Sequence, residues 1–420
     1  MMSVSKCAAA FLPLACLLWL ALSATAAGAV QAPFSTIQRG KYLVDAGDCM
    51  ACHTSEADKP FAGGYPVETP FGTIYSANIT PDRQSGIGAW SEEDFWRAMH
   101  FGVRPNGDRL YPAFPYPSFT KLTRDDVDAM HAYLATLKPE RNTPPANDLT
   151  WPLNHRVFMR GWNMLFFTPG EFRRNPAKSD EWNRGAYLVE GPGHCGACHT
   201  AKNAFGGDKE SRFLQGGGIQ SWFAPQIANG ARNGLQAWSE DDIVEYLKTG
   251  RNRMTGATGL MAEVITYSTS QLSDDDLRAI AAYLKDVAGG DEPKHEIPHQ
   301  SVMAAGKAVF NDSCAACHRT SGEGVERMFP PLKGNANVQS REPTTVIRVI
   351  LDGARTVATD KQPTPSSMPS YDWKLTDSEI AAVATYVRNA WGNSASPVDA
   401  DDVKALRKDL RSKDLQAIAR

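Results

Sequence analysis

Apolar residues recur with a helical period in three segments of the chain, and each segment begins in the same way. A Ser or Thr is followed three residues later by an acidic residue, which is the spacing of a capping box at a helix N-terminus. These pairs are Thr123 and Asp126, Ser273 and Asp276, and Thr376 and Glu379. The apolar positions that follow share one helix face: Val127, Met130, Tyr133 and Leu134; Leu277, Ile280, Tyr283 and Leu284; Ile380, Val383, Tyr386 and Val387. We therefore predict three amphipathic helices, each with a tyrosine at the same place.

Each of these helices closes a longer repeat, which opens with a short helix that contains a glycine. The opening segments are residues 39–44 (RGKYLV), 184–189 (RGAYLV) and 305–310 (AGKAVF). A glycine lets another helix approach closely, so we expect the tyrosine of the closing helix to pack across it. The first two repeats also predict a middle helix, which begins at a capping box after Ser91 or Ser239 and ends near Gly102 or Gly250.

Two segments lie outside the repeats. Residues 157–167 (VFMRGWNMLFF) are unusually aromatic for a linker. We interpret them as a buried connecting helix, and the alternative is a patch that faces a partner or a membrane. Residues 400–420 predict a charged helix with its apolar residues on one side: Val403, Leu406, Leu410 and Ile418. We expect this helix to dock on the protein, and a surface anchor is the alternative.

The N-terminus has the pattern of a secretory signal. Lys6 precedes an apolar run over residues 8–22, and residues 24–29 (ATAAGA) offer cleavage sites between small residues. We therefore predict a signal peptide over residues 1–29 and an exported chain. Cys7 and Cys16 lie inside this segment, and the residues before Cys16 make a poor lipoprotein signal.

Composition is that of an ordinary soluble protein with several domains. The 420 residues are 42% hydrophobic and 22% charged. A net charge of −3 gives no electrostatic reason to expect nucleic acid as a partner. Beyond the signal, no apolar run is long enough to span a bilayer, so we expect membrane attachment to be peripheral or through a partner.

The remaining cysteines all belong to Cys-x-x-Cys-His motifs, one in each repeat. This motif attaches haem c: both thiols add to the haem vinyl groups, and the histidine becomes an axial ligand of the iron. A protein with three such haems is expected to transfer electrons. The predicted covalent and proximal residues are Cys49, Cys52 and His53; Cys195, Cys198 and His199; and Cys314, Cys317 and His318.

Zinc is the alternative occupant of a Cys-x-x-Cys pair. A structural zinc site needs four ligands, so zinc would require motifs from distant repeats to pair, or further residues to join them. The export signal and the histidine directly after every second cysteine favour haem.

The residue on the opposite side of each iron decides whether the haem only transfers electrons or also binds small molecules. In the third repeat, Met368 lies shortly before the closing helix and is the predicted ligand. In the second repeat, Met261 and Met254 both follow Gly250, and the longer distance from Gly353 to Met368 in the third repeat favours Met261. The alternative for these methionines is to fill a gap in the core.

The first repeat departs from this pattern. Phe114 occupies the place where a methionine is expected, and Phe has no lone pair for iron. Met99 and Met130 align with apolar residues of the other repeats, so we expect them in the core. His100 and His131 align with residues that bind no iron. The sixth ligand of the first haem is therefore unassigned: the iron is five-coordinate, water-bound or held by a residue that the alignment does not reveal.

These patterns predict a mainly helical protein with three tandem domains, long haem-wrapping loops and little strand. The repeats resemble the class I cytochrome c fold. Proline-rich or polar stretches mark the boundaries. We predict cytochrome domains over residues 30–145, 177–292 and 293–395, an aromatic connecting segment over 146–176, and an amphipathic tail over 396–420.

Nearly the whole mature chain resembles the tri-haem cytochrome c subunits of bacterial membrane-associated dehydrogenases. The resemblance is carried by residues 184–190 with 194–200, 161–167, 110–116, 261–264 and 391–393. Such subunits partner flavoprotein gluconate, 2-ketogluconate, sorbitol or fructose dehydrogenases, or quinoprotein alcohol dehydrogenases. In that family, the loop around Phe114 commonly contains a methionine that is taken as an iron ligand, and this chain departs from it.

The resemblance implies a subunit on the periplasmic face of the cytoplasmic membrane, bound peripherally. It would take electrons from a catalytic subunit, in a complex that allows a small third subunit, and pass them to membrane quinone. The chain lacks a nucleotide-binding glycine fingerprint, so we expect no catalytic residues here and substrate oxidation on another chain. Two alternatives remain: a peroxidase-like haem enzyme with an open first haem, and a free periplasmic electron shuttle.

Overall fold

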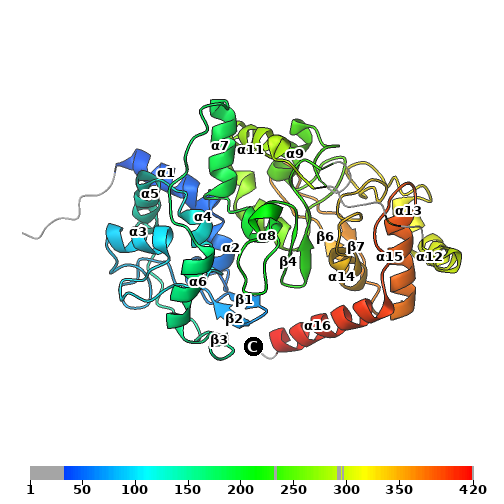
Figure 1. The fold of residues 1–420 in the computed structure, drawn as a ribbon, viewed down its shortest axis with the longest axis horizontal. Coiled ribbons are helices and arrows are strands. Elements are labelled where there is room, and N and C mark those ends of the chain that lie inside the picture. The colour runs from blue at the N-terminus through cyan, green and yellow to red at the C-terminus, as the bar shows by residue number, and fades with distance from the viewer. Residues whose placement is uncertain (1–32, 231–233, 291–294, 296–297, 419–420) are drawn as a thin grey trace, which may run out of the picture.

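The computed structural model describes residues 33–230, 234–290, 295 and 298–418, with side chains as far as Lys413. The predicted signal peptide over residues 1–29, with Cys7 and Cys16, lies outside the described residues. Helices dominate the described part, which confirms the mainly helical prediction. They form three groups that follow one another along the chain (Figure 1).

Each group is built on a crossed pair of helices. The pairs are α1 (Phe34–Ala46) with α5 (Arg124–Leu134), α7 (Asp180–Glu190) with α11 (Asp274–Asp286), and α12 (Gln300–Ser313) with α15 (Asp377–Asn389). At the second crossing, a Cβ on Gly185 would lie 1.9 Å from the carbonyl oxygen of Ala279 and 2.9 Å from Cβ of Tyr283. Gly40 and Gly306 meet their closing helices in the same way. The predicted packing of a tyrosine across a glycine is confirmed in all three repeats.

A middle helix accompanies each pair. These helices are α3 (Glu92–Phe101), α9 (Glu240–Thr249) and α14 (Thr344–Asp352). The first two begin at complete capping boxes and end at Gly102 and Gly250 in left-handed conformation, as predicted. α14 begins after Pro343 without a side-chain cap, so the sequence gives no start signal for it.

Short elements complete the groups. The remaining helices are α2 (Cys49–His53), α4 (Tyr116–Phe119), α6 (Met159–Phe166), α8 (Gly196–His199), α10 (Leu260–Tyr267), α13 (Ala315–His318) and α16 (Ala400–Ile418), with 3-10 turns η1 (Arg156–Phe158), η2 (Glu210–Arg212) and η3 (Thr269–Gln271). The strands are β1 (Pro66–Thr69), β2 (Gly72–Tyr75), β3 (Asp148–Leu149), β4 (Gly217–Ile219), β5 (Trp222–Ala224), β6 (Ala354–Arg355) and β7 (Ser367–Met368). They pair as antiparallel β1–β2–β3, β4–β5 and β6–β7.

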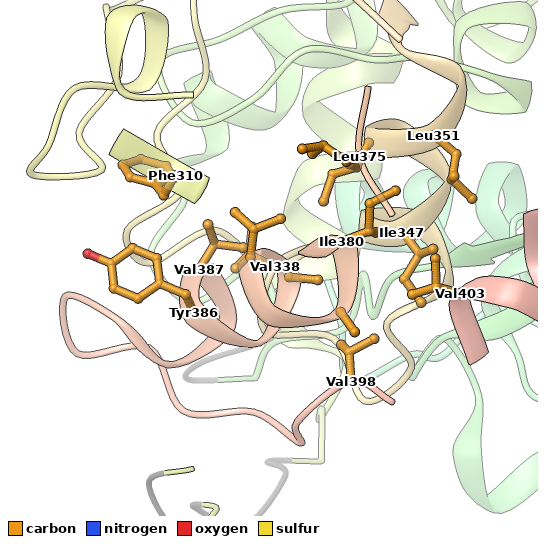
Figure 2. Packing of buried hydrophobic residues seen from close by; sticks show 14 of the residues in the cluster. Phe310, Val338, Ile347, Leu351, Leu375, Ile380, Tyr386, Val387, Val398 and Val403 are labelled. Carbon is orange, nitrogen blue, oxygen red and sulfur yellow. The ribbon is translucent and has the colours of Figure 1, made fainter. Parts of the chain in front are cut away.

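Each group encloses its own hydrophobic core. In the third core, Phe310 and Tyr386 lie at one end, and Ile347, Ile380 and Val403 lie at the other (Figure 2). Val403 belongs to α16, whose apolar side is buried in this core. The prediction that the tail docks on the protein is confirmed for the described residues.

The first two groups meet through a reciprocal pair of tyrosine contacts. Tyr42 on α1 donates its hydroxyl proton to Asp276 Oδ2 at 2.5 Å, at the N-terminus of α11. Tyr187 on α7 donates in the same way to Asp126, at the N-terminus of α5. We call these four residues the crossed seam.

The prediction of complete capping boxes is wrong for the first two closing helices, because their acidic residues belong to the crossed seam. The side chain of Thr123 does cap α5, but Asp126 forms no return bond to it; instead Asp126 pairs with Arg39 at 2.6 Å. The backbone N–H of Thr123 is left for the hydroxyl of Tyr187, at 3.4 Å. The second repeat behaves alike, with the cap N–H of Ser273 bound 3.1 Å from the hydroxyl of the first repeat's tyrosine.

The third repeat keeps the complete capping box of Thr376 and Glu379. Its opening helix carries Ala305 where the other repeats carry an arginine that pairs with a seam carboxylate. It carries Ala308 where they carry the seam tyrosine. With neither side chain present, the carboxylate stays with its own helix terminus. The third group therefore joins the others differently.

Contacts between loops and the tail attach the third group. The hydroxyl of Thr345 on α14 donates to the carbonyl of Phe223 on β5 at 2.8 Å, and accepts from the N–H of Phe223 at 2.9 Å. Val357 packs against Gly250 of the second group. At the far end of α16, Lys413 pairs with Glu68 of the first group at 2.8 Å. α16 thus reaches from the third group to the first.

The prediction of a buried connecting helix over residues 157–167 is wrong for one face of that segment. Met159 and Asn163 are buried, but Met164 and Leu165 are among the exposed large apolar residues. α6 is short and lies on the surface of the first two groups, so only one of its sides packs against them (Figure 1). Within the described residues, no helix combines the length and the apolar character that a bilayer crossing requires.

Candidate haem sites

The three Cys-x-x-Cys-His motifs occupy equivalent places in the three groups. Their short helices α2, α8 and α13 follow the opening helices along the chain and end at His53, His199 and His318. All six cysteines of the motifs are free. Every thiol that the motifs supply is therefore available for bonding to a haem vinyl group.

The three motif histidines make the same hydrogen bond through Nδ1. Their acceptors are backbone carbonyls: Ala77 for His53 at 2.6 Å, Pro225 for His199 at 2.6 Å, and Pro330 for His318 at 3.0 Å. A carbonyl oxygen can only accept, so Nδ1 carries the proton and Nε2 keeps its lone pair. The hydrogen bond also fixes the plane of the ring. This is the tautomer and the restraint that an iron ligand requires.

Burial keeps the motif histidines and the thiols of the second motif in their neutral forms. It lowers the pKa of His53, His199 and His318, and the carbonyl hydrogen bonds do not compensate. Burial likewise raises the pKa of Cys195 to about 12 and that of Cys198 to about 11. Neutral thiols are the form in which sulfur and hydrogen add across a vinyl group, and neutral imidazoles can bind iron. The motifs therefore fit covalent haem c.

Zinc would need a different arrangement of ligands. A structural zinc site holds four ligands, and its cysteines bind as thiolates. Within the described ranges, no group of three or more His, Cys, Asp or Glu side chains is placed to hold a metal ion.

The first two motifs adjoin each other where their groups meet. The Nε2 of His194, the residue before the second motif, lies 3.1 Å from the carbonyl oxygen of Gly47, just before the first. Haems bound to them would be neighbours.

Met368 lies beside the third motif. It stands on β7, paired with Ala354 of β6, and packs against the core that Cys314 also contacts. Three residues later, the hydroxyl of Tyr371 donates to the carbonyl of Ser313 at 2.6 Å, which ties this loop to the residue before the motif. This location suits an iron ligand, and the role of Met368 stays a prediction.

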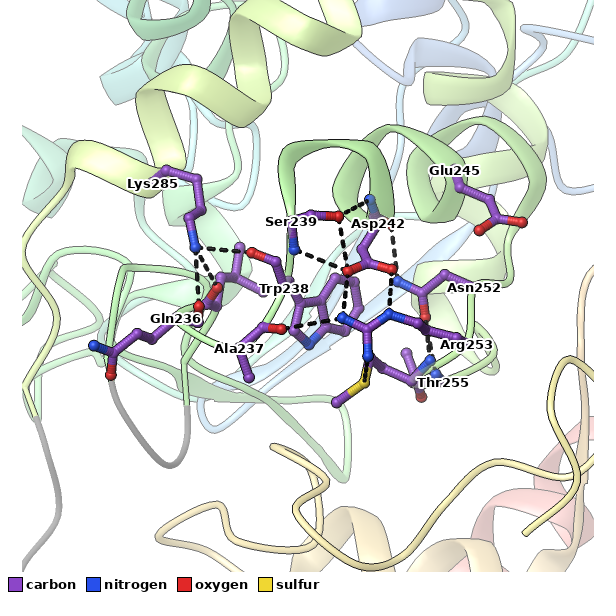
Figure 3. A network of polar contacts seen from close by, with 12 residues as sticks. Gln236, Ala237, Trp238, Ser239, Asp242, Glu245, Asn252, Arg253, Thr255 and Lys285 are labelled. Carbon is purple, nitrogen blue, oxygen red and sulfur yellow. Dashed lines mark hydrogen bonds and ion pairs between the residues drawn. The ribbon is translucent and has the colours of Figure 1, made fainter. Parts of the chain in front are cut away.

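The structure separates the two methionines of the second repeat. Arg253 pairs with Asp242 at 2.8 Å in the network that caps α9 (Figure 3), and its Nη1 lies 3.2 Å from Sδ of Met254. The sulfur of Met254 is thus bound within a polar network. Met261 lies on α10, in a small apolar cluster with Tyr246. These contacts favour Met261, and because α10 also touches α2, it lies near the junction with the first motif.

Phe114 takes part in the core of the first group. Its ring lies 5.2 Å from that of Phe119, between centroids, and packs against the core cluster. Met99 and Met130 are buried in the same cluster, which confirms the prediction that they are core residues. The position expected for a ligand is filled by an apolar ring.

The two histidines of the first group that lie outside the motif stack on aromatic neighbours. His100 lies 4.3 Å from the ring of Trp96, and His131 lies 5.1 Å from that of Phe95. Burial lowers the pKa of both. Nδ1 of His100 is buried with no hydrogen-bond partner in the described protein. The sixth ligand of the first haem site is still unassigned.

Sequence reasoning did not find the carbonyl acceptors of the motif histidines. Ala77, Pro225 and Pro330 follow their histidines by 24, 26 and 12 residues. The spacing differs between repeats, and a backbone acceptor leaves no mark on residue type. Only the course of the loop brings each carbonyl to its ring.

Comparison with known proteins agrees with this site. The family model for cytochrome c matches the chain three times, over residues 37–138, 183–288 and 303–391. The chain is 41% identical to the alcohol dehydrogenase (quinone) cytochrome c subunit of Gluconobacter oxydans (strain 621H), over 92% of this chain and 85% of the relative. It is 39% identical to the gluconate 2-dehydrogenase cytochrome c subunit of Pantoea cypripedii, over 90% and 91%. It is 37% identical to the fructose dehydrogenase cytochrome subunit of Gluconobacter japonicus, over 89% and 82%. Three matching segments, each with a Cys-x-x-Cys-His motif and an oriented histidine, place this chain in the cytochrome c family.

Proposed function

We propose that this chain is the electron-transfer subunit of a dehydrogenase complex. It carries three covalent haem c groups, accepts electrons from a flavoprotein or quinoprotein catalytic subunit, and passes them to membrane quinone. The observation that carries the proposal is the threefold recurrence of one arrangement: two free thiols, and a histidine whose Nδ1 is bound to a backbone carbonyl. The names of the relatives, which are cytochrome subunits of alcohol, gluconate and fructose dehydrogenases, support the choice of partner.

The residues of the chain hold and orient the haems. Each pair of cysteines fixes a haem covalently, and each histidine presents Nε2 to the iron. Met261 and Met368 are the proposed ligands on the other side of the second and third irons. When bound, haem c supplies an iron that accepts and releases one electron. The contact between the first two motifs supports direct exchange between their haems.

The proposal includes the architecture and the place of the protein. The three groups are class I cytochrome c-like domains over residues 30–145, 177–292 and 293–395, with the connecting segment over 146–176 and the tail over 396–420. The chain is exported after loss of residues 1–29 and works at the periplasmic side of the cytoplasmic membrane. The sequence of the N-terminus supports export.

A haem count tests this proposal. A pyridine haemochrome assay on the exported protein is expected to give three haems for each chain. Replacing Cys198 with Ala is expected to leave two, because one thioether and the integrity of the second site are lost. Ser35→Ala, a change outside the motifs on an exposed residue, serves as the control. Fewer than three haems in the unaltered protein would refute the tri-haem assignment.

Phe114 is the observation that favours a second candidate function. If no ligand replaces the missing methionine, the first haem is open to small molecules, as in a peroxidase-like enzyme. Carbon monoxide separates the two functions: rapid binding at one haem of three, with peroxide turnover, supports the enzyme. Slow or absent binding supports the electron-transfer subunit.

A further inference from the structure

A group of large apolar side chains faces outward at the first and second groups. We call them the apolar face: Trp151, Val157, Phe158, Met164 and Leu165, with Phe205 from the loop after the second motif. Met164 is 82% exposed and Leu165 is 70% exposed. Apolar residues scattered singly over a surface need no explanation, but several that gather on one helix face indicate a binding surface.

Helical spacing puts most of these residues on one side of the segment that includes η1 and α6. Positions 157, 158, 161, 164 and 165 follow a single helix face. At Gly161, in the middle of this face, a Cβ would meet nothing within 4 Å, so no described part of the protein covers the middle of the face. The opposite side carries the buried Met159 and Asn163. The protein covers one side of the helix and leaves its apolar face exposed.

The apolar face is firmly mounted. The side-chain oxygen of Asn163 accepts a hydrogen bond from the hydroxyl of Tyr116 at 2.6 Å. Nε1 of Trp162 donates to the carbonyl of Phe205 at 2.9 Å, and the ring of Phe166 stacks on that of Phe205 with centroids 6.0 Å apart. The exposed residues therefore belong to an ordered surface.

The charges around η1 and α6 indicate which kind of partner the apolar face contacts. Residues 149–170 contain Arg156 and Arg160 and no Asp or Glu, in a chain whose net charge is −3. Arg156 is engaged with the carbonyl of Arg109 and the ring of Tyr111, whereas Arg160 is exposed beside the apolar face. Tryptophan, phenylalanine and arginine without acidic residues are the composition of segments that lie in the headgroup region of an anionic bilayer. A protein interface would carry a rim of mixed polar residues.

We propose that the apolar face inserts into the surface of a membrane that contains anionic lipid. α6 has 8 residues, which at about 1.5 Å each is less than half of a hydrocarbon core of about 30 Å, so it lies in the interface and does not span it. The identity of the membrane as one that contains quinone rests on the proposed function. Tyr116, two residues after Phe114, holds α6 from the first group, and Phe205, six residues after the second motif, holds it from the second group.

Vesicle binding tests the proposal. The haem-loaded full chain is floated with vesicles of phosphatidylcholine, with and without phosphatidylglycerol. Met164→Glu combined with Leu165→Glu is expected to lower binding about tenfold or more, because two apolar side chains that the bilayer would bury are replaced by anions. Arg160→Gln is expected to lower binding about fivefold, and only to vesicles that contain phosphatidylglycerol. Met328→Glu, at an exposed methionine of the third group, is the matched control and is expected to bind normally.

The altered side chains point away from the described protein, so haem absorbance is expected to show normal folding of every variant. Equal binding by the double variant and the unaltered chain would overturn the proposal. The proposal would also be overturned if the unaltered chain bound no vesicle and only the double variant lost binding to a dehydrogenase partner. The apolar face would then be a protein interface. Vesicle binding needs neither quinone nor dehydrogenase, so the result stands apart from the fate of the proposed function.

Discussion

The side chain predicted to lie opposite each motif histidine differs from repeat to repeat, although the histidines themselves are held alike. Met368 lies in a loop tied to the third motif, Met261 lies in an apolar cluster near the junction of the first two groups, and Phe114 is part of a core. A methionine sulfur raises the potential of a haem iron. Differences of one side chain are therefore expected to give the three sites different potentials.

Replacing Met368 with Leu tests this at the third site. Leucine preserves volume but removes the sulfur, so the midpoint potential of one haem is expected to fall. A spectroelectrochemical titration of the whole chain measures it. Met254→Leu is the control, because the sulfur of Met254 already contacts Arg253, and its titration is expected to stay unchanged. An unchanged titration of the Met368 variant would assign the ligand elsewhere.

At the scale of elements, the repeat is a pair of helices in contact at a glycine. The tyrosine follows the capping Ser or Thr by 10 residues on the closing helix, and the glycine belongs to the opening helix, so each leaves a local pattern that the sequence displays. The helix pairs, two middle helices and their caps were predictable for this reason. α14 was not, because its start at Pro343 lacks a capping side chain.

Gly185→Ala tests the crossing. Alanine favours a helix by up to about 1 kcal/mol, but its Cβ would lie 1.9 Å from the carbonyl oxygen of Ala279, which is backbone and cannot move alone. Separating the helices is expected to cost about 1–3 kcal/mol of unfolding free energy. Thermal unfolding and proteolysis of the second group measure the loss. Gly170→Ala, where nothing lies within 4 Å, is expected to melt like the unaltered protein; equal melting of both variants would refute the crossing.

At the scale of the whole molecule, the first two groups form a pair and the third is attached by other means. The pair depends on the crossed seam, in which each group supplies a tyrosine to the other's helix terminus. The third group lacks the tyrosine and uses Thr345, Val357 and α16 instead. This arrangement sets the first two haem sites side by side.

The seam predicts a dependence on pH. Burial opposes the charged form of Asp276, but bonds from Arg184 and Tyr42 outweigh it and hold the pKa of Asp276 below its ordinary value of 3.8. A depressed pKa in the folded state stabilises the protein fully above the ordinary value, and this stability is lost as pH falls through the folded value. Asp276→Asn is expected to be less stable at about pH 7 and to lose less stability on acidification to about pH 3.

Urea unfolding at both pH values measures this effect. Asp275→Asn, at the exposed neighbouring carboxylate, is the control and is expected to follow the unaltered protein at both. Tyr42→Phe removes one of the bonds to Asp276 and is expected to fall between the two. If the Asp276 variant lost as much unfolding free energy on acidification as the unaltered chain, the seam would not be a cause of the pH dependence of stability.

The sequence by itself determined the chemistry and the helical repeat of this protein. Covalent attachment needs two cysteines and a histidine within five residues, and capping needs two side chains three residues apart, so both are local. The tertiary structure alone decided how the repeats are joined and what is exposed. Tyr42 and Tyr187 look alike in sequence whether or not they cross, and residues 157–167 have the same apolar pattern whether buried or open to solvent. What covers a face depends on residues far away in the chain, and periodicity carries no record of them.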